Sequence, residues 1–128
     1  MVLKLYKSYI RPKLEYAYTV WNTYYKKDME MIERVQRRVT RLPLELRDLP
    51  YETRLNILSL TTLRDRRTRG DLIETYKIIN GHYACNINFF HFSNNTNLRG
   101  HNYRLNKKRC SKLLRRNFFT NRVVHHRN

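Results

Sequence analysis

Two short segments of the chain are dense in arginine, whose planar and permanently charged guanidinium group is suited to bidentate contacts with phosphate. They read RVQRRVTR at residues 34–41 and RDRRTR at residues 64–69. Their composition predicts phosphate contacts by Arg34, Arg37, Arg38 and Arg41 in the first segment and by Arg64, Arg66, Arg67 and Arg69 in the second. The plain alternative for each cluster is a solvated, charged helix face.

Arg69 has a special position in the second cluster. Helical spacing places it on the same side as the apolar residues Leu72, Ile73 and Tyr76. A charged group beside apolar side chains needs a partner or an exit to solvent. We therefore expect Arg69 either to pair with an acid such as Asp71 or Glu74, or to reach past the core to a ligand.

A third basic run lies near the C-terminus and is the densest of all. Its cationic residues are Lys107, Lys108, Arg109, Lys112, Arg115 and Arg116. Tyr103, Phe118 and Phe119 flank the run, and aromatic side chains beside cations can stack unpaired bases. Two other interpretations stay open: Phe118 and Phe119 as core residues, and the whole run as a nuclear-localisation signal.

Histidine and cysteine residues in the second half raise the question of a zinc site. They are His82, Cys85, His91, His101 and Cys110. The His-x2-Cys spacing of the first two is compatible with zinc, but the paired Cys-x2-Cys of common zinc modules is missing. We predict neither a metal site nor a cofactor. No arrangement of Ser, Cys or His suggests nucleophilic catalysis.

The charge balance points to an anionic partner. The chain has 27 Lys and Arg against 10 Asp and Glu, a net charge of +17, and an isoelectric point near 10.4. Residues 61–128 carry 15 basic and 3 acidic residues, and none is acidic after Glu74. Proteins in this range bind nucleic acids or anionic surfaces, and self-repulsion within the C-terminal half favours a polyanionic partner.

The remaining composition limits the compartment. Two cysteines are too few for a disulfide scaffold. The chain has no run of 18 apolar residues, and its N-terminus lacks the apolar stretch of a signal peptide. We expect an intracellular protein, in the nucleus or the cytoplasm, that does not enter a membrane.

Apolar residues recur at helical spacing through most of the chain. In the second predicted helix the apolar seam consists of Met29, Ile32, Val35, Val39 and Leu42. The four arginines of the first cluster fall about 140° away from this seam at roughly 100° per residue. The predicted helices cover residues 3–21 with a break or kink at Pro12, 28–42, 48 or 50 to 60, 62–80 and 111–124.

Local signals sharpen this fold prediction. Thr62 and Asp65 form a capping-box pattern, and Asn80-Gly81 is a stop signal. Residues 87–105 lack helical periodicity and suggest a short β-hairpin around a polar turn. We predict a mainly α fold, a four- to five-helix bundle-like single domain over residues 1–128. Its helical part is 1–81, and its basic, less regular part is 82–128.

Five blocks of this sequence resemble, in the same order, the C-terminal region of non-LTR, LINE-type retrotransposon reverse transcriptases, of which jockey-like elements are the nearest group. The blocks cover nearly the whole chain. They are LYKSYIRPKLEYAYTVWN, MIERVQRRVTRL, LSLTTLRDRRTRGDLIETYKIING, RGHNYRL and RRNFFTNRVV.

The resemblance implies a thumb and thumb extension, a helical unit that follows the catalytic palm and grips template-primer RNA, DNA or their hybrid. The palm itself holds two metals with an Asp-Asp pair, and this sequence contains no such pair. We therefore expect no enzymatic activity from this chain, although the parent family consists of RNA-directed DNA polymerases.

Two alternatives to nucleic-acid binding stay open. The family pattern Arg-Val-Val-x-x-Trp-Asn places Trp at position 127, where this chain has Arg127. This departure favours a truncated or decayed transposon remnant without function. The second alternative is a docking module whose apolar seams pack on the missing palm.

Overall fold

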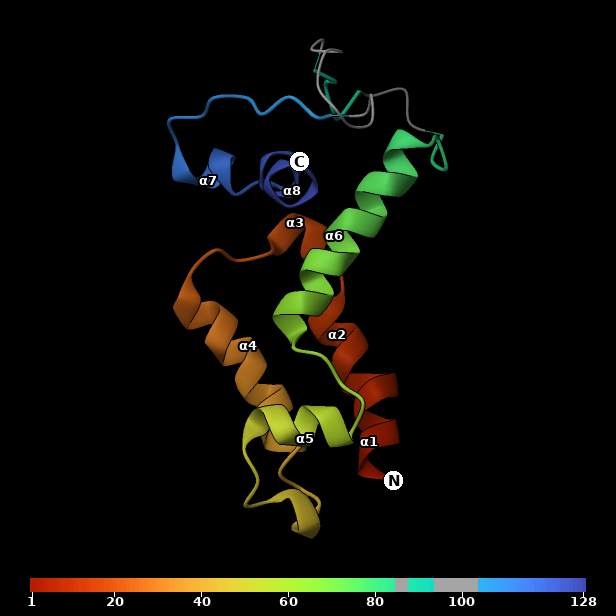
Figure 1. Ribbon diagram of the computed structural model, residues 1–128, viewed down its shortest axis with the longest axis vertical. Helices are drawn as coiled ribbons and strands as arrows, with labels where there is room; N and C mark the ends of the chain where they lie inside the picture. Colours follow the sequence, from red (N-terminus) through yellow and green to blue (C-terminus); the bar gives the residue numbers. More distant parts are fainter. Residues whose placement is uncertain (85–87, 94–103) are drawn as a thin grey trace. The chain divides into compact units, whose positions relative to one another are not determined.

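The computed structural model describes residues 1–84, 88–93 and 104–128 (Figure 1). These residues are mainly helical and form no extended strand, which confirms the predicted fold class. The chain divides into two compact units, Met1–Arg67 and Thr68–Asn128. The prediction of a single domain that changes character after residue 81 stays a prediction.

The N-terminal helix is interrupted at a different place from the one predicted. Helix α1 (Val2–Leu5), the π-helical turn η1 (Tyr6–Ile10) and α2 (Arg11–Glu15) follow each other without a break, and Pro12 lies in the first turn of α2. The wider π turn accommodates a proline, which has no N–H and crowds the preceding turn. The helix ends instead at Tyr16 and Ala17, where Ala17 has a φ of 51°, before α3 (Tyr18–Trp21).

Helix α4 (Lys26–Val39) does not bury its apolar seam as predicted. Val35 and Leu42 are exposed, and the other three seam residues are half-buried. The fully buried side chains are polar, Gln36 and Thr40. The hydroxyl of Thr40 donates to the carbonyl of Arg37 at 3.0 Å. Polar groups can replace apolar ones in a core when each finds a hydrogen-bond partner.

Gln36 is the centre of a buried hydrogen-bond network. Its Oε1 accepts from the hydroxyl of Tyr6 at 2.6 Å, and its Nε2 donates to the hydroxyl of Tyr51 and the carbonyl of Thr61, both at 3.0 Å. The hydroxyl of Tyr51 donates in turn to the carboxylate of Glu33. One amide side chain therefore connects η1, α4, α5 and the segment before α6.

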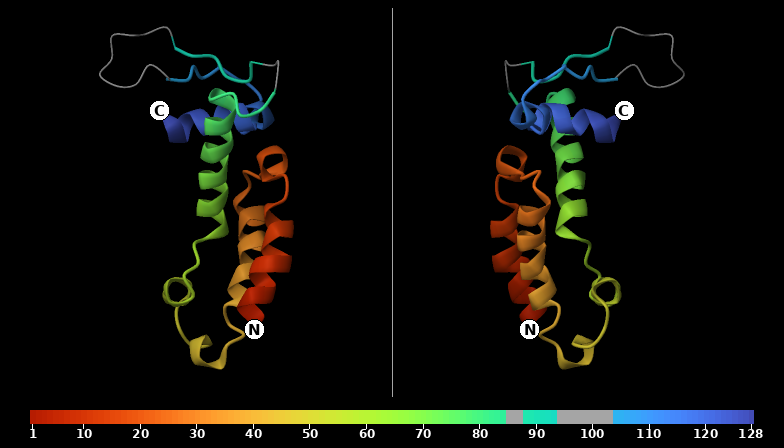
Figure 2. Two further views of the ribbon diagram at one scale, coloured as in Figure 1. Left: turned by 90° about the vertical axis from the view of Figure 1, so that its right-hand side faces the viewer. Right: turned by 90° about the vertical axis from the view of Figure 1, so that its left-hand side faces the viewer.

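The rest of the first unit closes around a small apolar core. After the 3-10 turn η2 (Leu44–Leu46), helix α5 (Tyr51–Ile57) lies across α4, since Figure 2 looks down α5 while α4 is seen lengthwise. Leu46, Leu55, Leu60 and Leu63 are buried. Ser59, with a φ of 50°, ends the turn after α5.

Helix α6 (Leu63–Ile79) begins and ends where the local signals predicted. The hydroxyl of Thr62 accepts from the backbone N–H of Asp65 at 3.1 Å and donates to its carboxylate at 2.7 Å. The carboxylate of Glu33 adds a second N-terminal contact by accepting from the N–H of Leu63 at 3.0 Å. At the other end Gly81 has a φ of 69°, a conformation that glycine adopts without a steric cost.

The second unit ends in two helices where one was predicted. Helix α7 (Leu113–Arg116) is followed by Asn117 and the extended Phe118, after which α8 (Phe119–Arg127) begins. The side chain of Asn117 donates back to the carbonyl of Leu113 at 2.9 Å, which competes with continuation of the helix. Leu105, Phe119, Val123 and Val124 are buried.

The predicted hairpin near residues 87–105 falls partly outside the described residues. At its described base, Phe92 and Leu105 form an antiparallel bridge. The N–H of Ser93 donates to the carbonyl of Arg104 at 2.8 Å, and that of Asn106 to the carbonyl of His91 at 2.7 Å. Among the described helices, none has the length and apolar character needed to cross a membrane.

Candidate nucleic-acid interface

The predicted arginine stripe on α4 is exposed along its whole length. Arg34, Arg37, Arg38 and Arg41 all belong to the exposed surface of the first unit. The guanidinium of Arg37 also lies over the ring of Tyr51, 5.1 Å from its centroid. This face can therefore contact an external anion without any rearrangement of the core.

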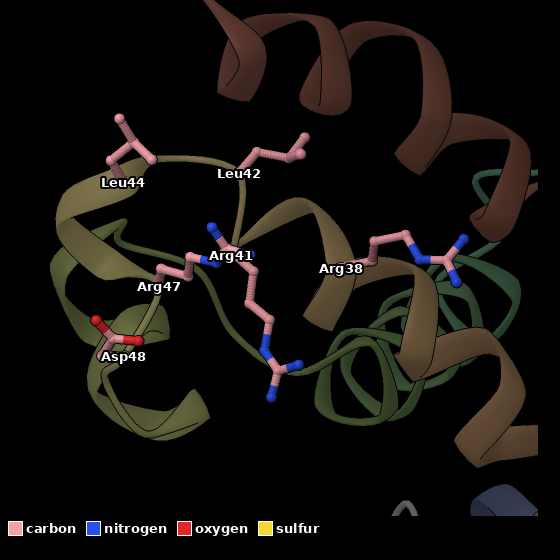
Figure 3. Close-up of a pocket in the computed structure, with 6 residues that line it drawn as sticks. All are labelled: Arg38, Arg41, Leu42, Leu44, Arg47 and Asp48. Atoms are coloured by element: carbon pink, nitrogen blue, oxygen red, sulfur yellow. The ribbon is translucent and has the colours of Figure 1, made fainter.

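The C-terminal end of this stripe forms one side of a groove of about 630 Å³. Three arginines, one aspartate and two leucines line it, and they come from the end of α4, the following loop, η2 and the residues directly after η2 (Figure 3). They are Arg38, Arg41, Leu42, Leu44, Arg47 and Asp48. Arg38 and Arg41 extend in different directions in this view, so they can reach separate groups on a ligand.

Arg54 lies close to this groove and was not predicted. Its side chain is 2% exposed. Its Nη1 donates to the carbonyl of Arg37 at 3.3 Å, and its guanidinium lies over the ring of Tyr51 at 5.6 Å. Within the described part of the chain, its Nε has no hydrogen-bond partner. Burial, together with the nearby charges of Arg41 and Arg37, lowers the pKa of Arg54.

A buried guanidinium stays protonated because its ordinary pKa is far above neutral. Arg54 therefore adds positive potential near Arg37 and Arg41. Its contacts given above are with a carbonyl and an aromatic ring, and neither neutralises its charge as a carboxylate would. The sequence signal for it was weak, since an arginine beside Leu55 in an amphipathic helix is normally expected to reach solvent.

The second predicted arginine cluster is divided between structural and exposed positions. Arg66 forms an ion pair with Glu15, with Nη2 and Oε2 3.1 Å apart, and this hydrogen bond raises the pKa of Arg66. Arg67 is 3% exposed and donates to the carbonyl of Leu63 at 3.1 Å and to Oδ1 of Asn22 at 3.4 Å. Arg64 and Arg69 are exposed.

The acids proposed as partners for Arg69 are engaged elsewhere. Both carboxylate oxygens of Asp71 accept from Arg122 at 2.8 Å. Glu74 accepts from Lys77 at 3.0 Å and from the hydroxyl of Tyr83 at 2.5 Å, and these hydrogen bonds lower the pKa of Glu74. Arg69 is exposed, so of the two alternatives predicted for it the second applies: its side chain points outward and can contact a ligand or solvent.

A second hollow in the first unit, of about 340 Å³, is less suited to phosphate. Arg37, Arg64 and Arg67 line it, but so do Glu30, Glu33 and Glu52. Carboxylates facing the same space repel an anionic ligand. The groove at the end of α4 is the better candidate, because Asp48 is the single acidic side chain that lines it.

The C-terminal basic run is exposed throughout. This holds for Lys107, Lys108, Arg109, Lys112, Arg115 and Arg116. Of the aromatic residues predicted beside it, Phe118 is 48% exposed, whereas Phe119 is buried and packs edge-on against Phe90 with ring centroids 5.9 Å apart. Tyr103 lies outside the described residues. Phe119 is therefore a core residue, and Phe118 is available at the surface.

The histidines and cysteines considered for zinc are described only in part. Cys85 and His101 lie outside the described residues. Within the described ranges, no three His, Cys, Asp or Glu side chains gather in a way that could hold a metal ion. Cys110 accepts from the amide of Asn121 at 3.3 Å.

Comparison with protein-family models, with curated proteins and with solved structures finds no significant match to this chain.

Proposed function

We propose that this chain is a post-palm region of a non-LTR retrotransposon reverse transcriptase that binds RNA, DNA or an RNA–DNA hybrid through phosphate contacts. It acts as a nucleic-acid-binding element without catalytic residues, inside the cell, in the nucleus or the cytoplasm. The polymerase chemistry of the parent enzyme belongs to a palm domain, which supplies the paired aspartates that this sequence lacks.

The observation that carries the proposal is the groove at the end of α4. Arg38, Arg41 and Arg47 line it with a single acid. The positive charge of the buried Arg54 lies close to Arg41 and adds to that potential. A site of this kind recognises a run of phosphates and not a base sequence, since it offers guanidinium groups without a recognition helix shaped for base edges.

The charge of the second unit supports the same partner. Residues 68–128 contain twelve Lys and Arg residues and two acids, a net charge of +10. Both acids, Asp71 and Glu74, already form ion pairs inside the unit. The exposed cations of residues 107–116 therefore have no local acid to neutralise them, and a polyanion fulfils that role.

Salt dependence of binding tests the proposal. With about six to ten phosphate contacts, affinity for a duplex should fall about a thousandfold or more between roughly 50 and 200 mM salt. Fluorescence anisotropy with labelled RNA, DNA and hybrid duplexes measures this directly. Failure of all three duplexes to bind at the lower salt concentration would refute nucleic-acid binding.

The proposed ancestry has a separate test. Several hundred nucleotides upstream of the coding region should encode a palm with an aromatic-Ala-Asp-Asp motif. Flanking sequence of an unrelated kind would contradict the assignment to a reverse transcriptase, whatever the chain binds.

Exposed apolar side chains favour a second candidate function, docking onto the palm of the same enzyme. On the N-terminal helices these include Val2, Leu5, Tyr9, Tyr16 and Val20. An apolar surface of this kind commonly marks a protein contact. Co-expression with a matching palm segment should increase the soluble yield of the chain, and an unchanged yield would count against docking.

A further inference from the structure

The second unit contains a pocket of about 210 Å³ between the segment at residues 88–91, the segment at 106–108 and the two C-terminal helices. Ligand sites for drug-sized molecules are larger, roughly 300–1,000 Å³. A pocket of this size fits one planar ring system, such as a single nucleobase, better than a whole cofactor.

Two aromatic side chains in the pocket wall are left uncovered. Phe89 is 40% exposed and Phe118 is 48% exposed, and both line the pocket. Their neighbours differ, since Phe119 is buried and Phe90 packs against it edge-on. Phe119 is thus a core residue and Phe90 is a partly buried member of the pocket wall, whereas Phe89 and Phe118 are exposed at the concave surface, where a flat apolar ligand can stack on them.

Polar groups in the same wall could read the edge of such a ligand. Asn106 and Asn121 line the pocket. The amide of Asn106 can both donate and accept hydrogen bonds, whereas Asn121 can offer a ligand only its acceptor oxygen, because both of its N–H groups are engaged. The amide of Asn121 is fixed in place, because its Nδ2 donates to the carbonyl of Arg115 at 2.7 Å and to the sulfur of Cys110 at 3.3 Å. Complementary donors and acceptors are found on every nucleobase edge.

Cations complete the pocket. Lys108 and Arg115 line it and are exposed, and none of the lining residues is acidic. A nucleotide carries its phosphate one sugar away from its base, so a stacking surface with adjacent Lys and Arg matches both parts of the ligand. An apolar peptide segment would bury the aromatic rings equally well, but it would leave these charges without partners.

Hydrogen bonds to the backbone fix the segments that form the walls of the pocket. The N–H of Asn106 donates to the carbonyl of His91 at 2.7 Å, which joins the two segments. The side-chain amide of Asn128 makes two hydrogen bonds with the backbone of the buried Leu105. Its oxygen accepts from the N–H of Leu105 at 3.2 Å, and its nitrogen donates to the carbonyl of Leu105 at 2.8 Å. A preformed site loses less entropy when a ligand binds.

From these observations we infer that this pocket binds one unpaired nucleobase of a single strand, stacked on Phe89 or Phe118, with the adjacent phosphate on Lys108 and Arg115. The inference rests on the proposed nucleic-acid binding and deepens it. The second unit would hold an unpaired nucleotide of RNA or DNA, whereas the groove of the first unit contacts phosphates alone.

Paired oligonucleotides separate stacking from phosphate contact. One is a labelled single strand with all its bases, and the other is an abasic strand with the same number of phosphates. The full chain should bind the base-bearing strand roughly 5- to 150-fold more tightly, the range that corresponds to one stacked base. The double variant Phe89→Ala with Phe118→Ala should bring this ratio close to one without weakening binding of the abasic strand, and the two single variants show which ring carries the base.

Three variants control the experiment. Phe92→Ala removes an equally exposed aromatic side chain of the same region that does not line the pocket, and its ratio should stay native. Phe118→Trp keeps a stacking surface and should retain the preference. The double variant Lys108→Gln with Arg115→Gln should weaken binding of the base-bearing strand and of the abasic strand by the same factor. RNA and DNA versions of each strand show which backbone is preferred.

Each outcome decides between the two levels of the proposal. Equal binding of the two strands by the native chain, with both binding at low salt, overturns the base pocket and leaves phosphate binding intact. Absence of binding to either strand overturns both. A preference for the base-bearing strand that survives when Phe89 and Phe118 are both replaced by Ala also overturns the pocket, because the bases would then be bound elsewhere.

Discussion

Asp71 and Arg122 form a two-point ion pair in the second unit, with Oδ2 and Nε 2.8 Å apart and Oδ1 and Nη2 also 2.8 Å apart. The residues lie on α6 and α8, 51 positions apart in the sequence. The carboxylate is almost fully buried, and the guanidinium is largely buried. This contact connects α8, near the C-terminus, to α6.

Removal of one partner should therefore be costly. Asp71→Asn leaves the charge of Arg122 without its counterion in a mostly dry site, and we expect a loss of about 3–5 kcal/mol in the free energy of unfolding. Chemical denaturation followed by circular dichroism measures it. The matched control is Glu74→Gln, which breaks the half-exposed pair with Lys77 and should cost far less than Asp71→Asn, because water screens a pair of this kind. Similar losses in the two variants would show that burial of the pair is unimportant.

Ionisation of the Tyr6 phenol should lower the stability of the first unit at alkaline pH. Burial raises the pKa of its phenol from 10.0 to about 12. The folded chain therefore holds this proton more tightly than the unfolded chain. The contribution of Tyr6 to stability is complete below the unfolded pKa, near pH 10, and is lost as the pH rises towards 12. Burial and the hydrogen bond to Glu33 raise the pKa of Tyr51 in the same direction.

Tyr6→Phe isolates this effect. The variant should be less stable than the native chain at about pH 9, because the acceptor of Gln36 loses its donor. The difference should shrink at about pH 11.5, where the native chain loses the contribution of Tyr6 and the variant has none to lose. Thermal melts at the two pH values measure it, and a difference that does not change with pH would argue against a proton held by burial.

The predictable parts of this fold are those decided by neighbours in the sequence. The cap formed by Thr62 and Asp65 and the left-handed Gly81 depend on residues within one helical turn, and both were predicted correctly. The helix class also followed from local spacing. Gln36 shows the limit, since nothing near it in the sequence indicates that Tyr6, Tyr51 and Thr61 will satisfy its amide in the core.

The arginines show the same limit at the candidate interface. The sequence singles out Arg69 but does not separate Arg66 and Arg67 from Arg64, because the side chains that engage them, Glu15 for Arg66 and Asn22 for Arg67, are each more than forty residues away. Arg54 is the reverse case, a cation on an amphipathic helix that is buried because η2 and α5 fold back on the end of α4. The helix is not broken at Pro12, because the preceding turn η1 is a wider π turn that accommodates the proline.

This division of the arginines predicts different effects on binding. Replacing Arg38, Arg41 and Arg47 together by Gln should lower the slope of log affinity against log salt by about 0.9 for each lost phosphate contact, close to three in total on a duplex. Arg66→Gln should leave the slope unchanged, because Arg66 is engaged with Glu15. Anisotropy titrations at several salt concentrations provide both slopes. Equal slopes for the two variants would exclude the groove as a phosphate site.

Arg54 provides the last prediction, which concerns stability and binding together. Its charge is buried beside Arg37 and Arg41, which costs free energy that the carbonyl of Arg37 and the ring of Tyr51 only partly offset. Arg54→Met keeps a long side chain without the charge, so the free chain should keep its stability or gain about 1 kcal/mol. The same variant should bind a duplex more weakly at low salt, because the potential behind the groove decreases.

A duplex should accordingly raise the melting temperature of the native chain more than that of the Arg54→Met variant, since a ligand that binds only the folded state stabilises it according to its affinity. Thermal melts with and without the duplex measure this difference. Leu49→Met changes an exposed apolar side chain near η2 and serves as a control that leaves the charge intact. If Arg54→Met unfolds the chain by itself, Arg54 is a structural cap of α4, and its proposed electrostatic role is wrong.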